Sequence, residues 1–301
     1  MSSVIAILTY RRAHAVRTFV DSILANCPNY PVAIFEDCGN MDPTFETLVP
    51  AGLTPTVNSE LEADVYVAPK YEVYMGRRNV GVAGNSNRAI RWFMNHPSKP
   101  DHLLLCNDDL IAHGDFPKLY AEAHKFFGIG LWCFCDLPGD TYRTVEVRAK
   151  GRPVKIATRM TGMMMSITRA VIEKIGYFDT YFGRFGEEHC DFNNRARFAG
   201  FLSLNGQPQP CLDIPCSVLT SQRVPSSIFD FDKGRLDNEA AMAMNAVAGR
   251  YACSSHYRPY RLFHGKVTAG NTEGGLPTYE LERLGYELVV DYDLRDARCL
   301  A

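Results

Sequence analysis

The sequence predicts an α/β sandwich with a mostly parallel central sheet and an irregular C-terminal extension. Short continuous apolar runs, such as residues 4–8, are typical of strands that are buried on both faces. Segments with apolar residues at helical spacing, such as residues 13–26, alternate with these runs. This alternation favours parallel strands that are joined by crossover helices.

The first half of the chain alternates regularly. After the strand at 4–8, the helix at 13–26 is closed by Pro28 and Pro31, because proline interrupts helical hydrogen bonding. A second buried strand follows at 32–35. The next elements are expected, in order, as a loop at 40–62 with room for one short helix, a strand at 65–67, a helix at 84–94, a strand at 102–106, a helix at 115–127 and a strand at 129–135.

The second half of the chain is less regular. Gly200 fits the C-cap of a helix over 188–199, because glycine readily adopts the left-handed conformation that ends helices. Proline, serine and glycine are frequent from residue 201 onward. The other elements of this half are expected as short strands within 141–165 and a helix at 167–175.

The composition is that of an ordinary folded protein, with 301 residues, 46% of them hydrophobic and 22% charged. A net charge of −2 argues against a wholly basic nucleic-acid coat or a polybasic membrane surface. The longest apolar run, residues 126–135, is too short to cross a bilayer, and the N-terminus lacks the basic start of a signal peptide. The ten cysteines show no metal-binding spacing. Because no export signal is seen, we expect a cytoplasmic protein with reduced, packed cysteines.

Polar clusters follow three of the predicted strands directly. They are residues 9–12, Glu36-Asp37 and residues 107–109. Ligands of open α/β sheets bind at the carboxyl ends of strands, so these clusters are expected to converge on one crevice. The carboxylates of Asp108 and Asp109 suit a hard divalent cation that keeps its waters and substrate phosphates. The alternative is an N-cap for the helix near residue 115.

Two further segments carry polar groups at predicted helix starts. In residues 79–90, Gly81 and Gly84 allow close backbone approach, and a helix start favours an anion; a plain loop and N-cap is the alternative. This segment lacks the dinucleotide-binding glycine pattern and the lysine of a P-loop. In residues 186–200, Glu188 and Asp191 share a helix face. Crowded acids can yield a general base, although acids in a first turn also simply suit the helix dipole.

Taken in order over about residues 4–201, these clusters resemble the GT-A fold, nucleotide-sugar-dependent glycosyltransferases of the family 2 type. The matching features are the strand followed by TYRR, the acid after the second strand, the Asn-x-Gly-x-Ala-x-x-x-Asn pattern in residues 79–87 and the DxD-like NDD. Residues 161–201 resemble the galactosyltransferase-like C-terminal half of that catalytic domain. The residues that the resemblance assigns to the donor are Thr9, Arg11, Asp37, Asn79, Asn87, Asn107 and Asp108.

The resemblance also implies a metal site and a general base. Asp109 would be a ligand of a divalent cation, manganese or magnesium. The usual Glu-Asp pair falls on Glu188-His189, so the candidate bases are Glu188, His189 and Glu187, with Asp191 supporting the turn. A late metal-binding histidine has no clear match near residues 218–222. The candidate replacements are His264 and His256.

The resemblance divides the chain into a catalytic domain at 1–205 and a C-terminal extension at 206–301. Within the domain, about residues 1–110 would bind the nucleotide and residues 111–205 would hold the acceptor and the catalytic groups. Residues 240–272 contain no aspartate or glutamate, and Arg258 and Arg261 within them would fold over the diphosphate as a lid. An ordinary basic surface is the alternative.

The expected function is metal-dependent, inverting transfer of a sugar from a nucleotide-diphosphate sugar, with UDP as the favoured nucleotide, to an acceptor hydroxyl. The alternatives are a nucleotidyltransferase and a non-catalytic module that binds sugars or nucleotides. A glycan, a protein, a small molecule and a hydroxymethylated base in DNA all remain open as acceptors. The basic, aromatic stretch at 250–266 would suit DNA, because Arg and Tyr contact phosphates and stack on bases.

Overall fold

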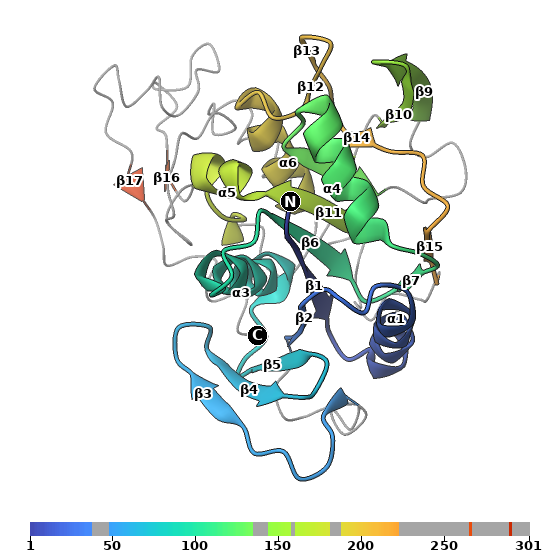
Figure 1. Cartoon of the computed structure of the whole chain (residues 1–301). Helices are drawn as coiled ribbons and strands as arrows, with labels where there is room; N and C mark the ends of the chain where they lie inside the picture. The colour runs from blue at the N-terminus through green and yellow to red at the C-terminus, as the bar shows by residue number, and fades with distance from the viewer. Residues whose placement is uncertain are drawn as a thin grey trace.

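The computed structural model describes residues 1–37, 48–134, 144–157, 160–180 and 188–222, together with the backbone of residues 265–266 and 289–290. Its centre is an eight-stranded sheet with helices on both sides (Figure 1). In spatial order the strands are β3 (Thr56–Asn58), β4 (Ala63–Val67), β5 (Glu72–Gly76), β2 (Val32–Glu36), β1 (Ser3–Thr9), β6 (His102–Asn107), β11 (Met164–Thr168) and β8 (Leu131–Phe134).

The sheet is mostly parallel in direction, which confirms the predicted fold class. The four central strands β5, β2, β1 and β6 pair in parallel. β4 and β11 run antiparallel to this block, and β3 and β8 reverse the direction again, so only two of the eight strands oppose the others. Every residue of β1 is buried, which explains why it is a continuous apolar run rather than an alternating one.

The helices form layers on the two faces of the sheet. α3 (Gly81–Asn95) lies on one side, whereas α1 (Ala13–Asn26) and α4 (Phe116–Phe127) lie on the other (Figure 1). The rings of Phe19 and Phe116 join α1 to α4, with centroids 6.4 Å apart. The later helices are α5 (Arg169–Ile175) and α6 (Glu188–Phe198).

The N-cap of α4 is Asp115, whose carboxylate accepts a hydrogen bond from the Lys118 amide. Residues 107–109 therefore do not cap this helix, and that alternative is wrong. The strand β7 (Leu110–Ala112) separates them from it. The helix expected from residue 167 begins at Arg169 because the preceding residues pair with β6 in the sheet.

Smaller strands pair around this core. β9 (Thr144–Ala149), β10 (Arg152–Ala157) and β14 (Leu212–Asp213) form one small sheet, and β15 (Leu219–Ser221) pairs with β7. The chain after residue 205 thus hydrogen-bonds to strands that precede it, although the predicted boundary there is still a prediction. The other pairs are β12 (Ser203–Leu204) with β13 (Gln207–Pro208) and β16 (Gly265–Lys266) with β17 (Val289–Val290).

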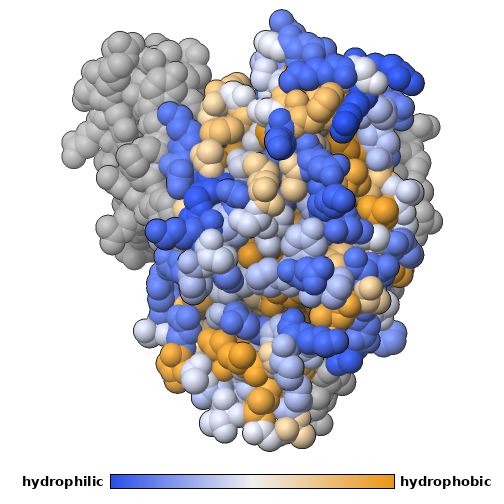
Figure 2. Space-filling view, viewed as in Figure 1, coloured by the Kyte–Doolittle hydropathy of each residue, from blue (hydrophilic) through white to orange (hydrophobic). Residues whose placement is uncertain are grey.

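The surface mixes polar and apolar side chains. Figure 2 shows apolar residues gathered at the lower end of the drawn face, where Figure 1 places β3, β4 and β5. On these outer strands Val57 is 65% exposed and Val67 is 61% exposed. Within the described part of the chain, no helix combines the length and the hydropathy that a membrane crossing needs.

Candidate functional site

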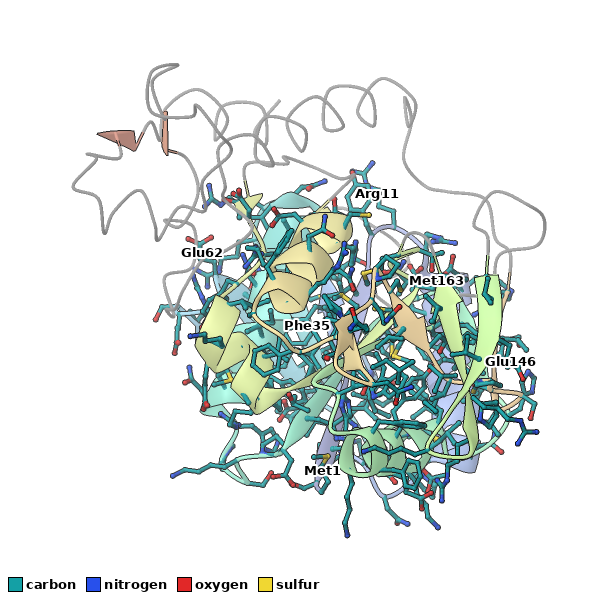
Figure 3. All side chains as sticks on the ribbon, turned by 90° about the horizontal axis from the view of Figure 1, so that it is seen from above. Met1, Arg11, Phe35, Glu62, Glu146 and Met163 are labelled. Carbon is teal, nitrogen blue, oxygen red and sulfur yellow. The ribbon has the colours of Figure 1, made fainter. Side chains whose placement is uncertain are left out.

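The carboxyl ends of the central parallel strands meet, as expected. The backbone amide of Asp37, after β2, donates to the Thr9 carbonyl at the end of β1 (3.1 Å). The backbone amide of Asn107, at the end of β6, donates to the Met163 carbonyl just before β11 (2.9 Å). Figure 3 shows Arg11 at the edge opposite Met1, because β1 runs from one edge of the molecule to the other.

Asp108 is held in a buried network at this edge. Its Oδ2 accepts a hydrogen bond from the Thr9 hydroxyl at 2.7 Å, and its Oδ1 accepts one from Arg12 Nη1 at 2.9 Å. Burial raises the pKa of Asp108 to about 7, against the opposing influence of the Arg12 guanidinium and the Thr9 hydroxyl. Both oxygens of Asp108 are therefore engaged by the protein itself.

Asp109 is placed differently from its neighbour. Arg12 Nη2 reaches its Oδ2 at 3.4 Å, and its Oδ1 is buried with no hydrogen-bond partner among the described residues. A buried carboxylate oxygen without a donor is costly unless something binds it. Asp109 is the one carboxylate of this cluster with an oxygen that fits a metal ion.

Within the described ranges, no three histidine, cysteine or acidic side chains gather closely enough to hold a metal by themselves. A cation at Asp109 would need ligands from substrate and water. Magnesium and similar hard ions are often held this way, by one or two carboxylates and substrate phosphates. The described residues therefore fit a metal site that substrate and water complete.

Arg12 lies in the predicted polar cluster at 9–12, but the resemblance assigns Arg11 and not Arg12 to the donor. Arg11 has φ +54° and an exposed side chain, and its guanidinium lies 5.4 Å from the Tyr10 ring centroid. Arg12 turns inward to the two aspartates and immediately precedes α1. The sequence signal for Arg12 was its position between a strand end and a helix start, but the local pattern does not distinguish adjacent arginines.

Asp37 forms a second buried network, at the start of α3. Its carboxylate accepts hydrogen bonds from the Val80 and Gly81 amides and from Arg88 Nη1, the last two at 2.8 Å. Burial raises the pKa of Asp37 to about 7, although Arg88 and the two amides favour the charged form. Gly76 permits this pairing, because an added Cβ would collide with the Arg88 guanidinium. The anion expected at this helix start is thus the protein's own carboxylate.

The two predicted asparagines of this segment also make internal contacts. Asn79 Oδ1 accepts from the Gly81 amide at 2.9 Å. Asn87 is fully buried, and its side-chain amide both donates to the Phe178 carbonyl (2.9 Å) and accepts from the Phe178 amide (2.8 Å). Their donor contacts stay predictions. The contacts seen here tie α3 to the segment that precedes α6.

Glu188 and His189 form a pair at the start of α6. His189 Nδ1 lies 2.7 Å from Glu188 Oε1, while Glu188 Oε2 is buried with no hydrogen-bond partner in the described chain. The His189 ring packs edge-on against Phe178, with centroids 5.5 Å apart. The pair therefore combines one carboxylate oxygen in contact with His189 and one buried oxygen without a partner among the described residues.

Gly162 brings this pair to the end of β6. Its backbone has φ +71°, and an added Cβ would lie 2.9 Å from His189 Nδ1, so the chain passes directly against the imidazole. The next residue, Met163, accepts the hydrogen bond from the Asn107 amide. The segment at 162–163 thus links the start of α6 to the strand end that carries Asp108 and Asp109.

Asp191 lies one turn further along α6 in a buried ion pair. Its Oδ2 accepts from Arg195 Nε at 2.9 Å, and the remaining Arg195 nitrogens donate to the carbonyls of Ile175 and Tyr177 at 2.8 Å each. This network ties α6 to residues 175 and 177. The support of the turn that the resemblance assigns to Asp191 stays a prediction. Glu187, the third candidate base, lies outside the described residues.

The late segment that lacks the expected histidine does pack beside Asp109. The Gln222 backbone amide donates to the Asp109 carbonyl at 2.6 Å. Its side-chain amide donates to the carbonyls of Ala15 and Leu110 at 3.0 and 2.8 Å, so Gln222 joins α1 to β7. The other predicted residues, which lie outside the described side chains, are Arg258, Arg261, His264 and His256.

No protein-family model and no curated protein matches the sequence. Among solved structures, the chain is similar to GalNAc-T7 with UDP, GalNAc and Mn²⁺, at 13% identity and a TM-score of 0.55, over 83% of this chain and 51% of that one. It is also similar to S. aureus TarS 1-349, at 12% identity and a TM-score of 0.44, over 68% of this chain and 56% of that one. The chain thus spans about half the length of these solved chains. The strand order, the polar strand ends and the GalNAc-T7 likeness together show that the chain has the GT-A fold.

Proposed function

We propose that the protein is a metal-dependent glycosyltransferase that moves a sugar from a UDP-sugar to an acceptor hydroxyl. The observation that carries this proposal is Asp109, whose buried Oδ1 has no partner in the described chain and lies at the carboxyl end of a central parallel strand. That strand edge is where α/β folds bind their ligands.

The likeness to GalNAc-T7 supports the donor class. GalNAc-T7 is a glycosyltransferase of the GT-A fold, and its structure holds UDP, GalNAc and Mn²⁺. At 13% identity this likeness shows the fold alone. The donor, the metal and the reaction are therefore proposed from the site residues together with the fold.

Asp109 would hold the metal, and Asp108 would position it. Thr9 and Arg12 fix both oxygens of Asp108, so the backbone of the NDD turn is held rigidly and the carboxylate of Asp109 is presented next to it. When bound, the metal supplies Lewis-acid neutralisation of the diphosphate leaving group. Arg12 adds a second positive charge beside the same group.

Glu188 would accept the proton of the acceptor hydroxyl at its Oε2. His189 Nδ1 lies 2.7 Å from the other oxygen, and this contact would orient the carboxylate. One base that activates the acceptor suits a single displacement, which inverts the configuration at the anomeric carbon. Asp191 and Arg195 would act through the helix start and not on the substrate.

The donor and metal are tested by thermal stability. UDP-, GDP- and dTDP-sugars are added to the full chain with manganese or with EDTA. A UDP-sugar at about a hundredfold excess over its dissociation constant should stabilise the protein by roughly 2.7 kcal/mol, with manganese only. Asp109→Ala should remove the manganese-dependent part, whereas Asp21→Ala, at an exposed acid on α1, should retain it. Equal shifts with and without EDTA would contradict the metal site.

The base is tested with Glu188→Gln, His189→Gln and the double variant. Glu188→Gln should retain donor binding and reduce turnover by about 10²- to 10⁴-fold. Because the two side chains form one hydrogen-bonded unit, the double variant should lose less than the product of the two single losses. If His189→Gln removes turnover and Glu188→Gln retains most of it, the roles are reversed.

Sugar release and transfer separate the competing classes. A nucleotidyltransferase would release pyrophosphate from a nucleoside triphosphate, and a binding module would be stabilised by the donor without consuming it. A glycan, a protein, a small molecule and hydroxymethylated DNA are offered as acceptors in parallel with the same donor.

We expect a cytoplasmic protein, as the sequence predicts, and fractionation of the source cells tests it.

A further inference from the structure

We propose that Arg12 is a built-in counter-ion of Asp109 that opposes a divalent cation there, so that metal and diphosphate bind cooperatively. This inference rests on the proposed function, because it concerns how that same site is loaded. It assigns Arg12 a regulatory role in metal binding. The inference is carried by the two unequal contacts of one guanidinium.

Arg12 makes a short contact with one aspartate and a longer contact with the other. Its Nη1 lies 2.9 Å from Asp108 Oδ1, whereas its Nη2 lies 3.4 Å from Asp109 Oδ2. Asp108 is fixed on its other side by Thr9 at 2.7 Å. The bond to Asp108 is therefore the stronger, and the reach to Asp109 is the contact that can be exchanged for another cation.

The electrostatic consequence follows from the position of the guanidinium. The Arg12 side chain is 17% exposed, so its charge is only partly screened by water. A divalent cation that binds Asp109 would meet this positive charge at close range, and the repulsion weakens the binding of the metal alone. The Gln222 backbone amide donates to the backbone carbonyl of Asp109 and not to its carboxylate.

A diphosphate reverses this balance. It brings negative charge to the same strand edge, attracts the guanidinium away from Asp109 and screens it from the metal. Metal and nucleotide then each tighten the binding of the other by the same factor, because such coupling is reciprocal. Arg11 does not compete in this way, because its exposed side chain lies over Tyr10 and not over the aspartates.

The test is the affinity for Mn²⁺ alone, measured by the electron paramagnetic resonance signal of free Mn²⁺. Arg12→Gln should bind Mn²⁺ about 5- to 150-fold more tightly than the unmodified protein, the usual range of coupling between sites. Arg12→Lys keeps the charge and should remain close to the unmodified protein. Arg17→Gln, which breaks an exposed ion pair on the same helix, is the matched control and should change nothing.

Added UDP completes the test. In the unmodified protein UDP should increase the Mn²⁺ affinity, and in Arg12→Gln this increase should be smaller, because part of the coupling is already removed. Unchanged or weaker Mn²⁺ binding in a folded Arg12→Gln variant would overturn the inference while leaving Asp109-dependent binding intact. If no variant binds Mn²⁺ with or without UDP, the proposed metal dependence itself fails.

A measurement on the unmodified chain covers the case in which Arg12→Gln does not fold. The ¹⁵Nε resonance of Arg12 should shift when diamagnetic Mg²⁺ and UDP are added together, and shift less with either alone. That of Arg17 should stay in place. If the ¹⁵Nε chemical shift of Arg12 does not change when Mg²⁺ and UDP are added together, the inference is also overturned.

Discussion

Asp37 and Asp108 occupy equivalent positions in the fold but are used differently. Each follows a central parallel strand, is buried, has its pKa raised to about 7 by burial and pairs with one arginine. Arg88, the partner of Asp37, is 3% exposed and shares that carboxylate with two helix amides. Arg12, the partner of Asp108, is more exposed and also reaches Asp109.

The two networks differ in where their hydrogen bonds end. The Asp37 network closes on itself, since its carboxylate meets a guanidinium and two amides inside the protein. The Asp108 network ends on a neighbour, Asp109, whose Oδ1 has no partner in the described chain. We infer that an acid whose donors are all internal supports the fold, and we propose that the acid beside a partnerless oxygen supports a ligand site.

Breaking the closed network should have the largest effect on stability. Asp37→Asn leaves Arg88 buried without its carboxylate and weakens the start of α3. We expect a loss of roughly 3–5 kcal/mol, the usual result of removing one partner of a buried ion pair. Urea unfolding followed by circular dichroism measures it. A smaller loss than in Asp108→Asn would contradict the claim that the Asp37 network stabilises the fold more than the Asp108 network.

Breaking the Asp108 network should lower the free energy of unfolding by a smaller amount. In Asp108→Asn, Arg12 keeps Asp109 as a partner and part of its solvent contact, and the asparagine can still accept from Thr9. We expect about 1–3 kcal/mol, typical of a weakened buried hydrogen-bond network. The same unfolding experiment applies. A loss as large as that of Asp37→Asn would assign both networks to the fold alone.

Two buried histidines, on β6 and α4, predict how the stability of the fold depends on pH. His102 and His124, whose rings lie 5.3 Å apart, have pKa values lowered to about 3 and 4 by burial. The unfolded chain then binds more protons, so their contribution to stability is present above about pH 6.5 and is lost as the pH falls towards 4.

Replacing one of these histidines should flatten this acid dependence. His124→Gln should reduce the slope by up to about 1.4 kcal/mol per pH unit, the value for one proton, while exposed His14→Gln should leave it unchanged. Urea unfolding at pH 4.5, 5.5 and 6.5 measures the slopes. Equal slopes for the two variants would show that the buried ring does not titrate with unfolding.

The smallest effect is expected at an exposed pair. Arg17 and Asp21 are four residues apart on α1, with Nε and Oδ2 3.0 Å apart, and each side chain is about half exposed. Arg17→Gln should cost no more than about 0.5 kcal/mol, because solvent screens such pairs. If Arg17→Gln lowered the unfolding free energy by about 2 kcal/mol or more, this pair could not serve as the weak reference for the ion pairs of Arg12 and Arg88.

The order of the main elements could be predicted from the amino-acid pattern, and the polar clusters at the strand ends predicted where a site would lie. The bounds of α1 match the expected helix at 13–26, and the apolar runs became the central strands β1, β2 and β6. These elements were predictable because burial on both faces, or on one helix face, imposes a pattern over consecutive residues. The strand β5 (Glu72–Gly76) was missed because a glutamate and a glycine at its ends interrupt its apolar run.

The partners of the polar residues could not be predicted from the sequence, because they depend on how distant elements pack. Thr9 meets Asp108 across 99 positions of sequence, and Asn87 meets Phe178 across 91, separations at which no local periodicity operates. The choice of Arg12 over Arg11 depends on one left-handed backbone angle, and the pairing of Asp37 with Arg88 depends on the room left by Gly76. Contacts of this kind depend on how distant elements pack, because each buried polar atom must find a partner wherever the fold places one.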